Sequence, residues 1–120
     1  MNTRMTRLKL SVIFNSGVRI GPGKIELLRR VQDTGSIAAA ARAMKMSYKR
    51  AWLLIESMNS LFRKPVVTAA TGGRKGGGAS LTPFGLEVLA CLERLEAEAR
   101  KSAERDLRTL ARLTRSSRAS

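Results

Sequence analysis

Two serines eleven residues apart constrain most strongly how this chain can fold. Ser36 directly follows Gly35, a residue type that commonly ends a helix, and its side-chain oxygen can accept hydrogen bonds from the first N–H groups of a new helix. Ser47 can cap a second helix in the same way. The residues between them are nearly all alanine from Ile37 to Met44, which makes the first helix short and slim. The spacing therefore predicts two closely packed helices joined by a turn at residues 44–46.

The second of these helices has an apolar stripe on one side only. Apolar residues recur at i, i+4, i+7 and i+11, namely Ala51, Ile55, Met58 and Phe62, and Pro65 marks where the helix stops. A helical wheel places Tyr48, Lys49, Trp52 and Leu53 away from this stripe, with Arg50 at its edge. Trp52 fits partial burial in the core and a contact at the edge of a nucleic-acid groove equally well.

A β-hairpin is predicted to follow. Residues 66–70 and 79–81 favour two short strands, and the segment between them holds five glycines together with Arg74 and Lys75, as expected for a flexible basic tip. At the other end of the chain, residues 8–14 alternate apolar and polar side chains, which favours a strand over the start of a signal peptide. The longest apolar runs fall far short of the roughly 18 residues of a membrane span, so we expect no membrane partner.

The last predicted helix is long. Thr82 and Pro83 supply an N-cap and an N1 proline, and after Gly85 no proline or glycine interrupts the chain to about Leu113. Thirty helical residues span roughly 45 Å, which is more than a domain of this size can cover. The apolar stripe on this helix is Leu92, Leu95, Ala99, Ala103, Leu107 and Leu110. We therefore expect these residues to form the interface of a homodimer.

These elements together define the predicted fold class, which is mainly α with a small β-hairpin wing. The order is that of a winged helix-turn-helix with an N-terminal strand and a long C-terminal dimerisation helix. We assign residues 1–82 to the winged helix-turn-helix region and residues 83–113 to the long helix of the same domain. Residues 114–120 are expected to be a disordered basic tail.

The charge of the chain is unevenly distributed along it. The formal net charge is +14, from 23 Lys and Arg against nine Asp and Glu. Residues 1–86 carry 15 basic and three acidic side chains, a net +12, whereas residues 87–120 carry eight and six, a net +2. A polyanion-binding surface should therefore lie in the first two thirds of the chain. The last helix, with the i,i+4 pairs Glu96/Arg100 and Glu104/Arg108, suits pairing with a second copy.

Double-stranded DNA is the polyanion that this arrangement favours. The second helix of a helix-turn-helix lies in the major groove, and its wing reaches the backbone or the minor groove. Arginine offers a fork for guanine or phosphate, and serine, tyrosine and lysine can donate to phosphates. The predicted DNA-binding residues are Ser36, Ser47, Tyr48, Lys49, Arg50, Trp52, Arg74 and Lys75. The alternatives are solvated surface charges for Lys49 and Arg50, and for the glycine-rich tip a merely flexible loop or a nest for a free oxyanion.

Catalytic and metal chemistry lack their usual residues. The chain has no histidine and one cysteine, Cys91, so common zinc sites, disulfides and Ser-His-Asp or Cys-His catalysis are excluded. We expect no enzyme activity, no cofactor and no metal, and we expect Cys91 to be a small buried residue. A single thiol is compatible with a reducing compartment.

Several motifs taken together resemble one family of regulators. They are Gly35-Ser36-Ile37 with the alanine run, Met46 to Trp52, Leu61-Phe62, the glycine-rich segment 72–78 and Leu81 to Gly85. This combination is similar to the N-terminal DNA-binding domain of ModE-type molybdate-responsive transcriptional regulators, and more distantly to the LysR-type winged helix, over about residues 8–110. Lys45 stands where the resemblance would place a glycine in the turn.

The resemblance implies a bacterial, dimeric transcriptional regulator of the cytoplasm and nucleoid whose long terminal helix makes the dimer contacts. Full-length members of the family continue into molybdate-binding modules, which this sequence is expected to lack. We therefore predict a sequence-specific regulator of a near-palindromic operator, with no effector identified by the sequence. The alternative is a non-specific nucleoid-type protein, for which the charge alone would suffice. An oxyanion sensor is a third possibility.

Overall fold

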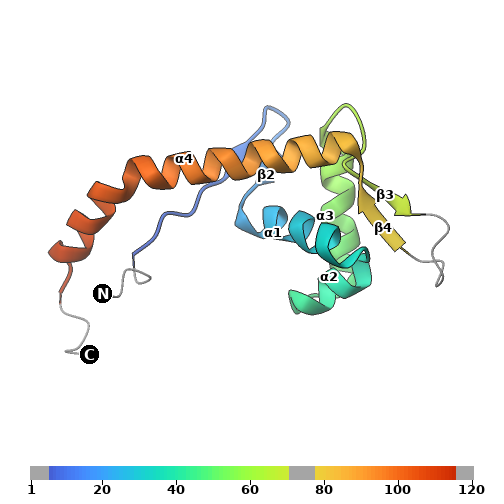
Figure 1. Ribbon diagram of the computed structural model, residues 1–120, viewed down its shortest axis with the longest axis horizontal. Coiled ribbons are helices and arrows are strands. Elements are labelled where there is room, and N and C mark those ends of the chain that lie inside the picture. Colours follow the sequence, from blue (N-terminus) through green and yellow to red (C-terminus); the bar gives the residue numbers. More distant parts are fainter. Residues whose placement is uncertain (1–5, 71–77, 116–120) are drawn as a thin grey trace.

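Figure 1 shows a computed structural model of the chain, in which residues 6–70 and 78–115 are described. The elements are β1 (Val12–Ile13), β2 (Arg19–Ile20), α1 (Pro22–Thr34), α2 (Ile37–Ala43), α3 (Tyr48–Leu61), β3 (Val67–Ala70), β4 (Gly78–Leu81) and α4 (Pro83–Leu113). The first three helices gather on one side of α4, and the β3–β4 hairpin extends from one end of the group (Figure 1). The predicted fold class, mainly helical with a small hairpin and a long last helix, is confirmed.

The N-terminal segment keeps its predicted alternation but forms a shorter strand than expected. From Thr6 to Phe14 every second side chain is half-buried, while those between are exposed. Only residues 12 and 13 pair with β2, with Val12 opposite Ile20 in antiparallel register. The partner strand cannot extend further because Pro22 already begins α1. The predicted alternation of side chains over residues 8–14 is therefore confirmed, whereas the predicted length of the strand is wrong.

Local signals set most helix ends. Gly35 adopts φ 70°, a left-handed conformation that ends α1. The Thr82 hydroxyl accepts a hydrogen bond from the Gly85 N–H at 2.8 Å and so begins α4. The exception is α3, which ends at Leu61 rather than at Pro65. It ends early because Phe62 turns into extended backbone, where its ring packs edge-on between Phe14 and Phe84.

The core lies between the three short helices, the β3–β4 hairpin and the first half of α4. Its largest fully buried side chains are Ile20, Leu27, Leu28, Val31, Met58 and Val66. Helix α4 contributes Leu89 and Leu92, whereas Cys91 is exposed. The expectation of a buried cysteine is therefore wrong, because one residue along a helix turns the side chain by about 100°. No helix in the described residues is long and apolar enough to cross a membrane.

Arg29 links α1 to α4 by ion pairs that join distant parts of the sequence. Its guanidinium donates hydrogen bonds to the carboxylates of Glu26, Glu93 and Glu96. The hydrogen bond to Glu93 raises the pKa of Arg29. Burial raises the pKa of Glu26, but hydrogen bonds from Arg29 and Arg30 outweigh burial, and the net effect lowers that pKa. Arg29 and Arg30 of α1 are therefore engaged within the chain.

Candidate nucleic-acid interface

Both predicted helix caps are present in the helix-turn-helix. The Ser36 hydroxyl oxygen accepts a hydrogen bond from the Ala39 N–H at 3.0 Å, and the Ser47 oxygen accepts one from the Arg50 N–H at 3.0 Å. Each cap fixes the N-terminus of a helix whose positive dipole end can face a phosphate. A capping hydroxyl still has its own hydrogen to donate, so both serines can also bind an anion.

The turn between the two helices is closed by a Schellman motif. The Met46 N–H donates to the Ala41 carbonyl at 3.0 Å and the Lys45 N–H donates to the Arg42 carbonyl at 3.1 Å. Lys45 adopts φ 56°, the left-handed conformation that usually requires glycine. The turn therefore keeps the geometry of a glycine-containing turn although a lysine occupies its central position.

Small side chains bring the two helices close together. Ala40 and Ala41 of α2 and Ala51 of α3 are buried where α2 packs against its neighbours. Ile55 and Met58 continue the buried side of α3 into the core, which confirms the stripe inferred from the sequence. One side of α3 is thus committed to packing, and its opposite side is left for a partner.

The outer face of α3 consists of Tyr48, Lys49, Arg50, Trp52 and Leu53, all of which are exposed. The exposed fraction is 55% for Tyr48, 43% for Trp52 and 51% for Leu53. Trp52 thus lies on the surface of the helix rather than in the core. Leu53 is absent from the DNA-binding residues predicted from the sequence, although the helical wheel already placed it outside the buried stripe.

A groove of about 320 Å³ separates α3 from the hairpin. Tyr48, Trp52 and Glu56 line it on the side of α3, and Thr68 and Ala69 line it on the side of β3. The two rings of the outer face therefore lie beside the groove that α3 shares with the hairpin. The predicted wing contacts Arg74 and Lys75 lie outside the described residues, as do residues 116–120 of the predicted tail.

Asn59 fixes the hairpin to α3. Its side-chain oxygen accepts hydrogen bonds from the N–H groups of Val66 and Val67 at 2.7 and 3.1 Å. Its side-chain nitrogen donates to the Val67 carbonyl at 3.0 Å. The Ala79 N–H of β4 also donates to the Gly35 carbonyl at 3.0 Å, between α1 and α2. The wing is therefore held at both strands against the helix-turn-helix.

Positive charge is left unpaired on this side of the molecule. Among the described residues, ion pairs engage Arg29, Arg30, Arg100 and Arg108, which lie on α1 and α4. No ion pair between described residues involves Lys49 or Arg50 of α3. Both cations at the N-terminus of α3 are therefore available to a polyanion.

The predicted dimer residues on α4 differ in how far they are buried in their own chain. Leu92 is buried in the core of its own chain, and Glu96, 8% exposed, is the last buried residue of the helix. Beyond it the helix continues for 17 residues to Leu113, about 25 Å, with no buried side chain. The other predicted contacts are half-buried (Ala99, Ala103, Leu107) or exposed (Leu95, Leu110).

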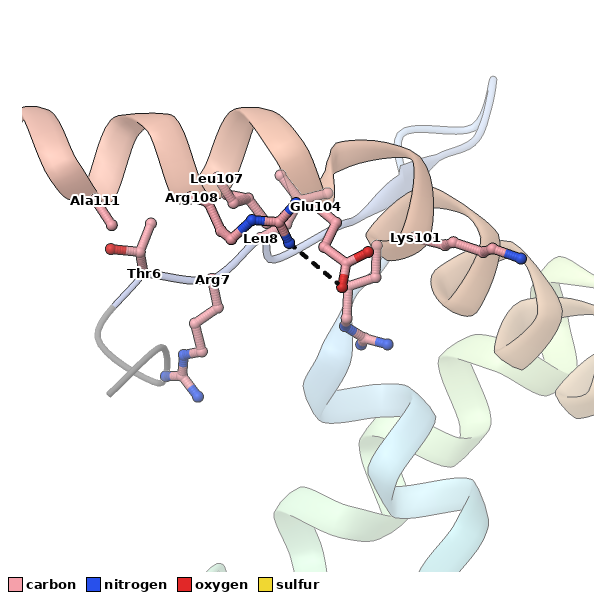
Figure 2. Close-up of a pocket in the computed structure, with 9 residues that line it drawn as sticks. Thr6, Arg7, Leu8, Lys101, Glu104, Leu107, Arg108 and Ala111 are labelled. Carbon is pink, nitrogen blue, oxygen red and sulfur yellow. Dashed lines mark ion pairs between the residues drawn. The ribbon is translucent and has the colours of Figure 1, made fainter. Parts of the chain in front are cut away.

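The N-terminal segment already lies along this part of α4. Figure 2 shows Thr6, Arg7 and Leu8 opposite Leu107 and Ala111 across a groove of about 540 Å³. The groove also carries the Arg108–Glu104 ion pair at 3.7 Å. A partner that contacts α4 on the side of Leu107 would therefore meet the N-terminal segment as well, which the sequence alone did not indicate.

The chain is similar in sequence to known bacterial regulators. Residues 23–86 match the family described as "Bacterial regulatory helix-turn-helix protein, lysR family". The molybdenum-pterin-binding protein MopB of Rhodobacter capsulatus is 48% identical over 86 residues, which are 72% of this chain and 32% of MopB. The molybdenum transport protein ModE of Azotobacter vinelandii is 36% identical over 97 residues, or 81% of this chain and 36% of that protein. The chain thus spans about a third of the length of these relatives.

Solved structures share the fold. The DNA-binding domain of CbnR, crystallised as a complex with DNA, has a TM-score of 0.59 at 20% identity, covering 74% of this chain and 95% of that domain. VV2_1132, a LysR family transcriptional regulator, has a TM-score of 0.53 at 18% identity, covering 68% of this chain and 26% of that protein. The fold is therefore that of a winged-helix DNA-binding domain.

Proposed function

This chain belongs to the LysR-type family of bacterial regulatory helix-turn-helix proteins and has ModE-type relatives, and from that premise we propose that it binds DNA sequence-specifically as a dimeric transcriptional regulator. The observation that carries the proposal is the outer face of α3. It is exposed, its cations form no ion pair with other described residues, and it begins at a capped helix N-terminus. The complex of the CbnR domain with DNA supports the same partner for this chain.

In the proposed complex α3 enters the major groove with its first turn nearest the base edges. Arg50 supplies a bidentate donor for guanine or for a phosphate, and Lys49 supplies charge. Ser36 and Ser47 donate to phosphates beside the two helix N-termini. Tyr48 and Trp52 lie beside the protein groove between α3 and the wing. Arg74 and Lys75 at the wing tip contact the DNA backbone or the minor groove.

The proposed dimer forms through the second half of α4. The helix projects beyond the domain core (Figure 1), and its apolar stripe there consists of Leu95, Ala99, Ala103, Leu107 and Leu110. Glu104, paired with Arg108 at 3.7 Å, offsets part of the positive charge beside this stripe. A two-fold dimer of this kind would read a near-palindromic operator, with half-sites about one helical turn or a multiple of it apart. We place this activity, which involves no catalysis, in the bacterial cytoplasm at the nucleoid.

Two substitutions test the roles of helix and wing. Arg50→Ala is expected to relax sequence preference, because a base contact is lost, whereas Arg74→Ala should weaken all sequences alike. Affinities for a preferred fragment and for random duplex, measured across salt concentrations, separate the two effects. A preferred fragment should bind at least about 10³ times more tightly than random DNA. Identical changes in both variants would reject the assigned roles.

A non-specific nucleoid-type protein is the alternative that the net charge supports. Such a protein would show equal affinity for all sequences at every salt concentration. The exposed outer face of α3 favours specific docking, because a general polyanion binder needs no helix face that is free to enter the major groove.

A further inference from the structure

Leu53 is an apolar residue on a surface that otherwise carries charge and hydrogen-bonding groups. It is about half exposed, whereas Ala51, Ile55 and Met58 fill the buried side of the same helix. The core therefore does not need Leu53, and the side chain has no hydrogen-bonding capacity with which to hold solvent or a phosphate. An exposed apolar side chain in this position is suited to contact an apolar group on a partner.

Leu53 lies on a different side of the outer face from the two rings. Tyr48 and Trp52 line the groove next to the wing, and Leu53 is not among the residues of that groove. It follows Lys49 by one helical turn, so these two side chains share a stripe that continues from the N-terminus of α3. If α3 occupies the major groove, this stripe lies over base pairs rather than over the backbone that the wing follows.

The major-groove edge of DNA offers one apolar group, the C5-methyl of thymine. We infer that Leu53 contacts a thymine methyl and makes the protein select thymine at one position of each half-site. This inference rests on the proposed function, because it presumes that α3 docks in the major groove.

Self-association through Leu53 is the competing use of such a residue. The surrounding side chains argue against it, because Lys49 and Arg50 pair with no acid in the described part of the chain and would be brought together across a two-fold contact. The second half of α4, where Glu104 pairs with Arg108, offers exposed leucines for that purpose, including Leu110, which is 55% exposed. Leu53 is thus better placed to meet DNA than a second copy.

The experiment removes single methyl groups from the DNA. A preferred site is first selected from a random duplex pool, and each thymine in it is then replaced by deoxyuridine, which pairs identically but lacks the methyl. Binding is measured for the wild type, for Leu53→Ala, and for Leu86→Ala as a matched change at another exposed leucine, on α4. Thermal melting confirms that each variant is folded.

At one thymine per half-site the wild type and Leu86→Ala should lose about fourfold in affinity, and roughly fifteenfold when both half-sites are changed. Leu53→Ala should bind DNA with and without that methyl group equally tightly, while substitutions at other thymines should change its affinity as they do for the wild type. The inference about Leu53 is overturned if no deoxyuridine substitution weakens binding by the wild type, or if Leu53→Ala loses the same affinity as the wild type at every position. Either result leaves the proposed function standing. A change in oligomeric state of Leu53→Ala with an unaltered profile would also overturn it. A pool that yields no preferred site would overturn the proposed function itself.

Discussion

Gly85→Ala tests the close packing of α4 against the backbone that leads into the wing. Gly85 lies in the first turn of α4 against the segment that leads into β3. A Cβ atom added there would lie 2.1 Å from the Val66 carbonyl oxygen, 2.8 Å from its carbonyl carbon and 3.0 Å from its Cα. That carbonyl also accepts a hydrogen bond from the Thr82 N–H at 3.0 Å. The added methyl therefore collides with backbone that is already held in place.

The expected loss of stability follows from these distances. A carbon and a carbonyl oxygen approach no closer than about 3.3 Å, so backbone must shift by roughly 1 Å. Overpacking of this kind costs about 1–3 kcal/mol, and the upper value applies because no side chain can rotate away. The lost Thr82 hydrogen bond costs about 1 kcal/mol, which offsets the gain of about 1 kcal/mol from alanine's higher helix propensity. The free energy of unfolding should therefore fall by about 3 kcal/mol.

Urea denaturation followed by circular dichroism measures this change, and the melting temperature should fall by roughly 15 °C. Gly23→Ala is the matched control, because a Cβ at Gly23 in α1 would have no neighbour within 4 Å. That variant should be as stable as the wild type or more stable by up to about 1 kcal/mol. A Gly85→Ala protein within about 0.5 kcal/mol of the wild type would refute the steric argument.

Three further perturbations probe the turn, the ion pairs and the wing. Lys45→Gly should raise the free energy of unfolding by about 1 kcal/mol, because glycine adopts the left-handed φ of 56° without strain. Lys45→Ala should leave the free energy of unfolding unchanged, and denaturation of both variants in urea measures the difference. Because the folded-state pKa of Glu26 is lowered from its ordinary value of 4.5, its contribution to stability is present above that pH and is lost as the pH falls through the lowered value. Arg29→Gln should make stability between pH 5 and pH 3, measured by thermal melting, less dependent on pH, and an unchanged dependence would contradict the assignment. Asn59→Ala should cost about 2 kcal/mol by unmaking the hydrogen bonds to Val66 and Val67, and an unchanged urea midpoint would show that the side chain does not hold the wing.

Features set by neighbouring residues could be predicted from the sequence. The caps at Ser36, Ser47 and Thr82 each involve a residue and an N–H three positions later, so the order of residues is sufficient to identify them. The left-handed end of α1 at Gly35 and the buried stripe of α3 are also local properties. These features suffice to locate the helix-turn-helix and its outer face.

Features that depend on distant parts of the chain could not be predicted in the same way. Arg29 meets Glu93 and Glu96, which are 64 and 67 residues away. The sequence analysis paired Glu96 with Arg100 along one helix surface, and this describes only part of its surroundings, because Glu96 also pairs with Arg29. The early end of α3 depends on where Phe62 finds other rings, and the exposure of Cys91 depends on which side of α4 packs. Tertiary contacts decide each of these outcomes.

Selection of bound sequences from a random pool of DNA duplexes tests the central claim most directly, namely that this chain reads DNA as a two-fold dimer through α3. The predicted result is an enriched site with two inverted half-sites, about one helical turn or a multiple of it apart. Arg50→Ala should enrich sites with a relaxed base preference at one position in each half. A bound pool with the same base composition as the starting pool would contradict the account.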